Sequence, residues 1–223
     1  MKRFISLFLV IVMCLSLCAC GGSSNKKAFS AAQDAYRNID DAYEVIEQFG
    51  EDIYEAWRMG IYDYDEDDFG LAYLAKKLNL SEDDLRMGIV YLVYRDKWEE
   101  MTDEEKQSFI DNAELIFSVA MDSVNSVFSL CVQVVSSSYE ANGKTAEVQA
   151  LLDEAKSQMK EMSEKYSDYE HYPSLKGYYT TSNAFFDFCK NPSGSFEQVK
   201  NTINDYRNQA RSYISDLNYI FED

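Results

Sequence analysis

The sequence predicts an all-α protein, an elongated antiparallel helical bundle with an inserted short helical hairpin. Only two prolines and nine glycines occur in 223 residues, so few residues interrupt helix formation. Long segments place apolar residues at alternating spacings of three and four, whereas no strand-like alternation runs beyond a few residues. Short connections separate these segments, which is typical of helices packed side by side.

The N-terminal residues 1–19 have the order of a secretory signal peptide. Lys2 and Arg3 form a positive segment, and a largely apolar stretch from Phe4 to Leu17 follows it. This stretch is shorter than the span of about 20 residues that a membrane-crossing helix needs. A charged start, an apolar run and a small-residue end together indicate a signal that is removed.

The signal ends in the motif Leu17, Cys18, Ala19 and Cys20. This motif resembles the lipobox of bacterial lipoproteins, although Cys18 stands where Ala, Ser or Thr is commoner. The resemblance covers only residues 1–25. It implies that Cys20 carries a thioether-linked diacylglycerol after cleavage behind Ala19. The expected location is therefore extracytoplasmic, with the chain anchored to the cell membrane by lipid.

The mature chain is expected to form one acidic domain. The lipidated Cys and a flexible tether are predicted over residues 20–27, followed by a helical-bundle domain over residues 28–223. The formal net charge is −18, and it becomes −20 when Lys2 and Arg3 leave with the signal. Such a body does not attract nucleic acid or anionic lipid, whereas it attracts basic partners or cations.

The first long helix is predicted over residues 27–59. Its apolar positions alternate by three and four without a slip, which is the spacing of a heptad seam between nearly parallel or antiparallel helices. These positions are Phe29, Ala32, Tyr36, Ile39, Tyr43, Ile46, Gly50, Ile53 and Trp57.

An insertion of a loop and a helical hairpin is predicted over residues 61–100. Its two helices are expected over residues 68–78 and 82–98, and Ser81 with Asp84 has the spacing of a capping pair. The hairpin superficially resembles a helix-turn-helix. Because three acidic residues open its second helix, where a DNA reader would face phosphates, nucleic acid is not an expected partner.

A second long helix is predicted over residues 103–140. Thr102 and Glu105 have the spacing of a capping box at its start. Asn142 and Gly143 follow its last apolar residue, and this pair is typical of a left-handed helix C-cap.

Three helices are expected after that turn. The first two are predicted over residues 145–169 and 174–190, separated by Pro173, and the sequence does not decide whether they lie in line or fold back. The last helix is predicted to begin at a capping pair formed by Ser195 and Gln198.

Three acidic residues in the loop after the first helix, Asp63, Asp65 and Asp67, are a weak calcium candidate. An EF-hand that starts at Asp63 would need Gly at its sixth position and Glu at its twelfth, where this chain has Asp68 and Leu74. A solvated loop without metal is therefore the favoured interpretation.

Two cysteines remain in the mature domain, Cys131 and Cys189, and both fall on apolar stripes. They are either buried small hydrophobic residues or, in an exported protein, a disulfide between facing helices.

No catalytic constellation is evident in the sequence. His171 is the only histidine, so an ordinary zinc site with a Cys/His cluster is missing. His171 is expected to lie exposed at a helix end, and no Ser-His-Asp arrangement is evident around it. Carboxylate pairs among 39 acidic residues are expected by chance. The chain is therefore not expected to be an enzyme or to need a cofactor.

Aromatic residues are frequent on the predicted apolar stripes. A buried tyrosine needs a partner for its hydroxyl group, so these residues either fill the core with hydroxyls at its rim or line a ligand pocket between helices. The pocket candidates are Tyr36, Tyr43, Trp57, Tyr166, Tyr178 and Tyr206.

The favoured functional hypothesis is a lipid-anchored, extracytoplasmic, non-catalytic binding or interaction module for an unidentified protein or small ligand. The alternative is a structural or accessory lipoprotein of an envelope transport or wall-assembly complex. A carboxylate pair with a raised pKa in a deep cleft would instead indicate an enzyme.

Overall fold

The computed structural model describes residues 2–64, 69–123 and 126–221, with side chains described from Asn25 onward. This part of the chain is helical and contains no strand, which confirms the predicted all-α class. The helices are α1 (Lys2–Tyr62), α2 (Leu71–Ala75), α3 (Glu82–Tyr94), η1 (Arg95–Lys97), α4 (Asp103–Ile110), α5 (Ala113–Ser123), α6 (Val127–Ala141), α7 (Lys144–Lys165), α8 (Tyr172–Lys190) and α9 (Phe196–Phe221).

Helix α1 is the central helix of the bundle, since it packs against α6, α7, α8 and α9. The predicted seam of α1 is buried from Ala32 to Trp57, and only Phe29 at its start is exposed. Gly50 within the seam allows a close approach, because a Cβ atom there would lie 2.4 Å from Cζ of Phe185. The regular spacing of three and four therefore predicted the buried face of this helix correctly.

Helices α6 and α7 follow one another along α1 and run antiparallel to it. The Tyr139 hydroxyl of α6 donates a hydrogen bond to Asp52 at 2.8 Å, and farther along, Asn38 Nδ2 donates to Gln158 of α7 at 3.0 Å. Gly143 stands between the two helices with φ of 85°. This left-handed residue, which the sequence predicted, ends α6, and α7 begins directly after it and continues along α1.

Helix α8 folds back beside α7 and runs parallel to α1. Tyr178 near its start donates a hydrogen bond to Asp40 at 2.8 Å, whereas Phe185 lies against Gly50 farther along α1. Pro173 is in the first turn of α8, where its missing N–H group leaves no helical hydrogen bond unmade. The two segments on either side of Pro173 therefore fold back on each other.

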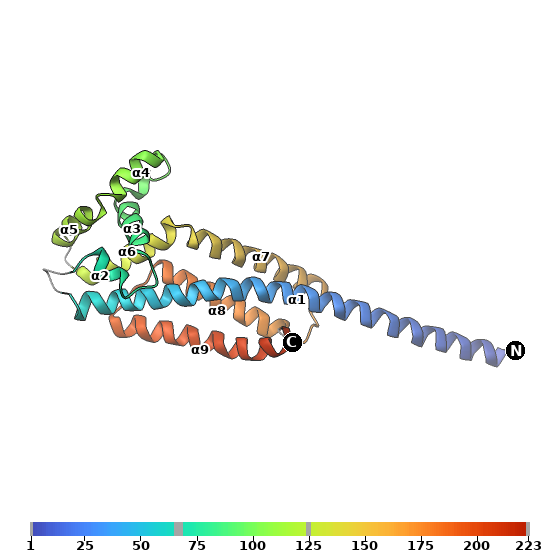
Figure 1. The fold of residues 1–223 in the computed structure, drawn as a ribbon. Coiled ribbons are helices and arrows are strands. Elements are labelled where there is room, and N and C mark those ends of the chain that lie inside the picture. The colour runs from blue at the N-terminus through green and yellow to red at the C-terminus, as the bar shows by residue number, and fades with distance from the viewer. Residues whose placement is uncertain (1, 65–68, 124–125, 222–223) are drawn as a thin grey trace.

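Helix α9 runs antiparallel to α1 and completes the bundle. Its start packs against the far end of α1, where Phe196 stacks on Tyr54, and its end lies near Gln33, which donates a hydrogen bond to the Phe221 carbonyl at 2.9 Å. Figure 1 shows α2 to α5 gathered at the end of the bundle opposite to the C-terminus.

The prediction of one long helix over residues 103–140 is wrong. The structure divides this segment into α4, α5 and α6. The first break follows Ile110, where the Asn112 side chain donates a hydrogen bond to the Ser108 carbonyl at 2.7 Å and so competes with helical backbone bonds. The second break ends at Ser126, whose backbone is extended. Helices α4 and α5 therefore belong to the insertion, which reaches beyond the predicted boundary at residue 100.

Other predicted boundaries shift by a few residues, while the predicted caps are present. Helix α2 is shorter than predicted, α3 gives way to η1 after Tyr94, and α7 ends at Lys165. Side-chain to backbone capping bonds form within the pairs Ser81 and Asp84, Thr102 and Glu105, and Ser195 and Gln198. The sequence therefore predicted the capping residues correctly, whereas it did not predict the lengths of the helices.

The predicted lipidation site lies outside the residues whose side chains the structure describes. This applies to Cys20 and to Leu17, Cys18 and Ala19 before it. Residues 25–27 of the predicted flexible tether are helical and exposed. They belong to α1, whose first buried residue in the described part is Ala28. No helix in the described part of the chain is both long and apolar enough to span a membrane.

An ion-pair network joins α1 to α9. Arg207 Nη2 lies 2.6 Å from Glu51 Oε2 and also donates to the Glu47 carbonyl at 3.2 Å. The Arg207 side chain is 17% exposed, whereas Arg211, one turn later, is 66% exposed and pairs with Glu47 at 3.2 Å. The two arginines thus make similar contacts at different depths.

We expect Arg207→Ala to lower the free energy of unfolding by about 2 kcal/mol, because the half-buried Glu51 carboxylate loses its partner. Arg211→Ala is the matched control and should cost at most about 0.5 kcal/mol, since an exposed pair contributes little. Urea unfolding at constant m-value measures both losses. Equal losses for the two variants would contradict the conclusion that the more deeply placed Arg207 contributes more stability than the exposed Arg211.

Candidate functional site

A groove of about 440 Å³ lies where the end of α1 meets α6, η1 and the turn between α8 and α9. Its volume is within the range of small-molecule binding sites in proteins. It is formed by four segments that are far apart in the sequence, so it exists only in the folded bundle.

The floor of the groove is apolar. Trp57 and Phe128 stack on each other with ring centroids 5.5 Å apart and ring planes inclined by 17°. Val132 and Leu92 extend this surface. Gly60 allows α6 to begin this close to α1, because a Cβ atom there would lie 2.4 Å from Phe128 Cα. The floor therefore offers an apolar surface that includes two aromatic side chains.

One face of α6 supplies a polar wall. Ser129, Gln133, Ser136 and Glu140 recur at spacings of three and four, so helical geometry places them in one row along the groove. Gln133 Nε2 donates a hydrogen bond to Ser129 Oγ at 3.1 Å. Short serine side chains leave space above the floor, and their hydroxyl groups both donate and accept hydrogen bonds.

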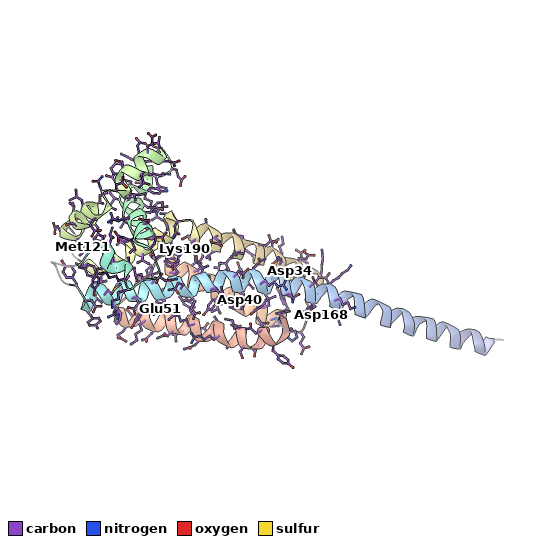
Figure 2. The ribbon with its side chains drawn as sticks, in the orientation of Figure 1. Asp34, Asp40, Glu51, Met121, Asp168 and Lys190 are labelled. Carbon is purple, nitrogen blue, oxygen red and sulfur yellow. The ribbon has the colours of Figure 1, made fainter. Side chains whose placement is uncertain are left out.

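Charged side chains also line the groove. Arg95 Nη2 lies 2.6 Å from Glu140 Oε2 and 2.8 Å from Glu140 Oε1. Lys190 pairs with Asp187 at 2.9 Å and lies over the Phe186 ring at 4.3 Å from its centroid. Figure 2 labels Lys190 on this part of the bundle. The groove wall is therefore less acidic than the chain as a whole.

Three of the predicted pocket aromatics pack together in the core instead of around this groove. The Tyr178 ring lies 6.1 Å from the Tyr36 ring and 5.6 Å from the Tyr43 ring, between centroids. Burial raises the pKa of Tyr178, and its hydroxyl donates to Asp40. The Tyr43 hydroxyl is buried and has no hydrogen-bond partner in the described structure. These residues fit the interpretation of tyrosines that fill the core.

The other three predicted aromatics are dispersed. Trp57 lines the groove, whereas Tyr166 lines a separate cavity of about 220 Å³ near the α7–α8 turn. Tyr206 stacks on Phe185 with ring centroids 5.3 Å apart. The structure therefore brings only one of the six candidates to the groove.

The calcium candidate is described only in part. Asp63 pairs with Arg58 at 3.1 Å, and Asp65 and Asp67 lie outside the described residues. Among the residues that the structure describes, no group of three or more His, Cys, Asp or Glu side chains is placed to hold a metal ion.

Cys131 and Cys189 are buried free thiols in the structure, not a disulfide. Burial raises the pKa of Cys131 to about 12 and raises the pKa of Cys189 as well. Both therefore stay protonated at neutral pH, which removes the thiolate that a nucleophilic cysteine needs.

Sequence reasoning missed a buried carboxylate, Asp52, which is only 2% exposed. Its two oxygens accept hydrogen bonds from Gln48 Nε2 at 3.1 Å, the Asn79 backbone N–H at 3.0 Å and the Tyr139 hydroxyl at 2.8 Å. Burial raises the pKa of Asp52, although these three donors oppose the shift. The available signal was an acid directly before Ile53, inside the apolar seam.

The charged residues of the groove were also missed. Arg95 and Glu140 are 45 positions apart, and Lys190 is farther along the chain, so no short motif contains them. Only the close packing of α3 on α6 brings Arg95 to Glu140.

No protein-family model matches the chain, and no curated protein and no solved structure matches it either.

Proposed function

We propose that this chain is a lipid-anchored, extracytoplasmic binding module that holds a small organic ligand in the groove between α1 and α6. The single observation that carries the binding part is the groove itself. It combines an aromatic floor at Trp57 and Phe128 with a row of hydroxyl and amide groups on α6. Sites of this kind bind ligands that have one flat apolar face and several polar edges.

The anchoring part rests on the N-terminal motif. Leu17, Cys18, Ala19 and Cys20 support cleavage before Cys20 and attachment of a diacylglycerol to its thiol. Helix α1 then leads from the N-terminal end of the bundle to the groove. Asn25 and Trp57 are 32 residues apart on this helix, which corresponds to about 48 Å. The groove would thus stand well above the membrane surface.

A non-catalytic role is part of the proposal. Among the described residues that line the groove there is no histidine and no cysteine, and the one carboxylate, Glu140, is bound by Arg95. These side chains supply stacking and hydrogen bonds, which are interactions for recognition.

A tryptophan reporter tests the proposal directly. The chain has two tryptophans, so Trp98→Phe in the full chain, purified in detergent, leaves Trp57 as the only tryptophan, whose emission is read with excitation selective for tryptophan. We expect a member of a panel of hexoses, N-acetylated amino sugars, amino acids, polyamines and short peptides to shift the Trp57 emission. A ligand at a hundred times its dissociation constant should also add about 2.7 kcal/mol to the free energy of unfolding.

A matched pair of variants locates the binding. Gln133→Phe fills the groove from an exposed position of α6 and should abolish the emission shift, whereas Gln149→Phe on the exposed face of α7 should leave it unchanged. The proposal fails if no compound of the panel shifts the Trp57 emission, or if Gln133→Phe binds as well as the control.

A further inference from the structure

Helix α5 has apolar side chains on two opposite faces, and only one face is covered. Ala113 and Phe117 are buried on the side that packs against α3. Leu115 and Val119 on the other side are 66% and 61% exposed, more than any other large aliphatic side chain of the described residues. A helix that is apolar on both faces is normally buried on both. The second face therefore lacks the partner that its composition requires.

Leu115 and Val119 form a ridge of helical shape. They are four positions apart on α5, so their side chains are neighbours along one side of the helix. A ridge with this spacing fits the groove on the apolar face of another amphipathic helix.

The segment of sequence that carries this ridge is strongly acidic. Residues 99–122 contain eight acidic residues against one basic residue, Lys106, which is a net charge of −7. Helical spacing places Asp122 one turn after Val119, and Asp111 lies just before the start of α5. Asp122 has no ion pair or hydrogen bond in the described part of the chain. The carboxylate of Asp122 is therefore free to pair with a basic residue of a partner.

From this charge complementarity we propose that the ridge of Leu115 and Val119, with the acidic residues beside it, docks a positively charged amphipathic helix of a partner protein. A second copy of this chain is itself strongly acidic, with a net charge of −18 over the full sequence, and would be repelled. Basic residues beside an apolar face satisfy both features of the surface at once.

A membrane is disfavoured as the occupant because of where the ridge lies. Figure 1 shows α4 and α5 at the end of the bundle opposite to the C-terminus, and Figure 2 labels Met121 of α5 far from Asp34 and Asp168. This step rests on the proposed function, in which the N-terminal anchor holds the other end of the bundle at the lipid.

Photo-cross-linking in cells that make the full chain tests the proposal. p-Benzoylphenylalanine is placed at Leu115 or Val119, and at the exposed Ser157 of α7 as a control. We expect protein adducts from the first two positions and none from the third. Mass spectrometry should identify the attached segment as net positive, with apolar residues at helical spacing.

Paired charge variants test the complementarity. With the cross-linker at position 119, Asp111→Asn with Asp122→Asn should lower the adduct yield severalfold. Asp153→Asn with Glu161→Gln on α7 removes the same charge elsewhere and should leave the yield unchanged. Equal yields from the two double variants would overturn the proposal.

The remaining outcomes separate this proposal from the proposed function. An adduct with lipid, with a second copy of this chain or with an uncharged or acidic segment overturns the docking proposal, as does the lack of an adduct from membrane-bound protein. If instead the chain fractionates away from the membrane while an adduct with a basic helix still forms, the anchor fails and the docking surface stands.

Discussion

Gly88→Ala is expected to lower the free energy of unfolding by about 3 kcal/mol, because one added carbon would overpack the contact between α3 and α6. A Cβ atom at position 88 would lie 2.1 Å from Ser138 Oγ, 2.7 Å from the Val134 carbonyl oxygen and 2.8 Å from the Ser138 backbone nitrogen. Two of these atoms belong to the backbone, so the helices themselves must separate. The higher helix propensity of alanine offsets about 1 kcal/mol of the steric cost at most.

Urea unfolding of the full chain measures this loss, and the double variant Gly88→Ala with Ser138→Ala serves as its control. Removing the Ser138 hydroxyl relieves only the side-chain contact, so we expect it to restore less than half of the lost stability. Full recovery would contradict the backbone clash. Arg95, which lines the groove, follows directly after α3. Separation of α3 from α6 should therefore also widen the groove and weaken the ligand-induced shift of Trp57 emission.

Asp52→Ala is expected to lower the free energy of unfolding by about 3 kcal/mol, since it leaves the three donors around this buried carboxylate without an acceptor. Those donors are the Tyr139 hydroxyl, Gln48 Nε2 and the Asn79 backbone N–H. They come from α6, α1 and the loop before α3, so the loss should loosen the insertion as well as the bundle. Thermal unfolding monitored by circular dichroism measures the effect.

Asp52→Asn is the conservative control. Its remaining oxygen can still accept from Gln48 and Asn79, and its amide group can donate to the Tyr139 hydroxyl, so the loss at neutral pH should be only about 1 kcal/mol. A loss as large as that of Asp52→Ala would show that the negative charge, and not the hydrogen bonding, is what the site requires.

The same pair of proteins has an expected pH dependence. Burial raises the pKa of Asp52 above that of an aspartate in the unfolded chain, about 3.9. The native state therefore holds this proton more tightly, and the stability contributed by protonation is full below the unfolded pKa and is lost as pH rises through the folded pKa. The stability of the unsubstituted chain relative to Asp52→Asn should thus fall with rising pH, and a rise would contradict the raised pKa.

The buried face of α1 was predictable because it depends on local periodicity. Every residue of the seam from Ala32 to Trp57 lies at a spacing that one helix dictates, whatever packs against it. The caps at Ser81, Thr102 and Ser195 were predictable for a similar reason, since a side chain there bonds to a backbone group three residues away.

The division of residues 103–140 was not predictable from that pattern. Apolar residues keep helical spacing on both sides of Asn112, so periodicity carries no mark of the break there. What ends α4 is a side-chain bond from Asn112 to the Ser108 carbonyl, together with the packing of α5 on α3 instead of along α1. A helix boundary of this kind is decided by tertiary contacts that override propensity.

By itself, the sequence determined the helical class, the acidic charge, the face that α1 buries and the N-terminal motif that predicts an anchor. Only the tertiary structure decided which residues share a site. It placed Tyr36, Tyr43 and Tyr178 in the core and assembled the groove from Trp57, Arg95, Glu140 and Lys190. The physical reason is the distance along the chain over which each feature is determined. Periodicity and caps depend on residues within one or two helical turns, whereas a groove depends on how separate helices pack.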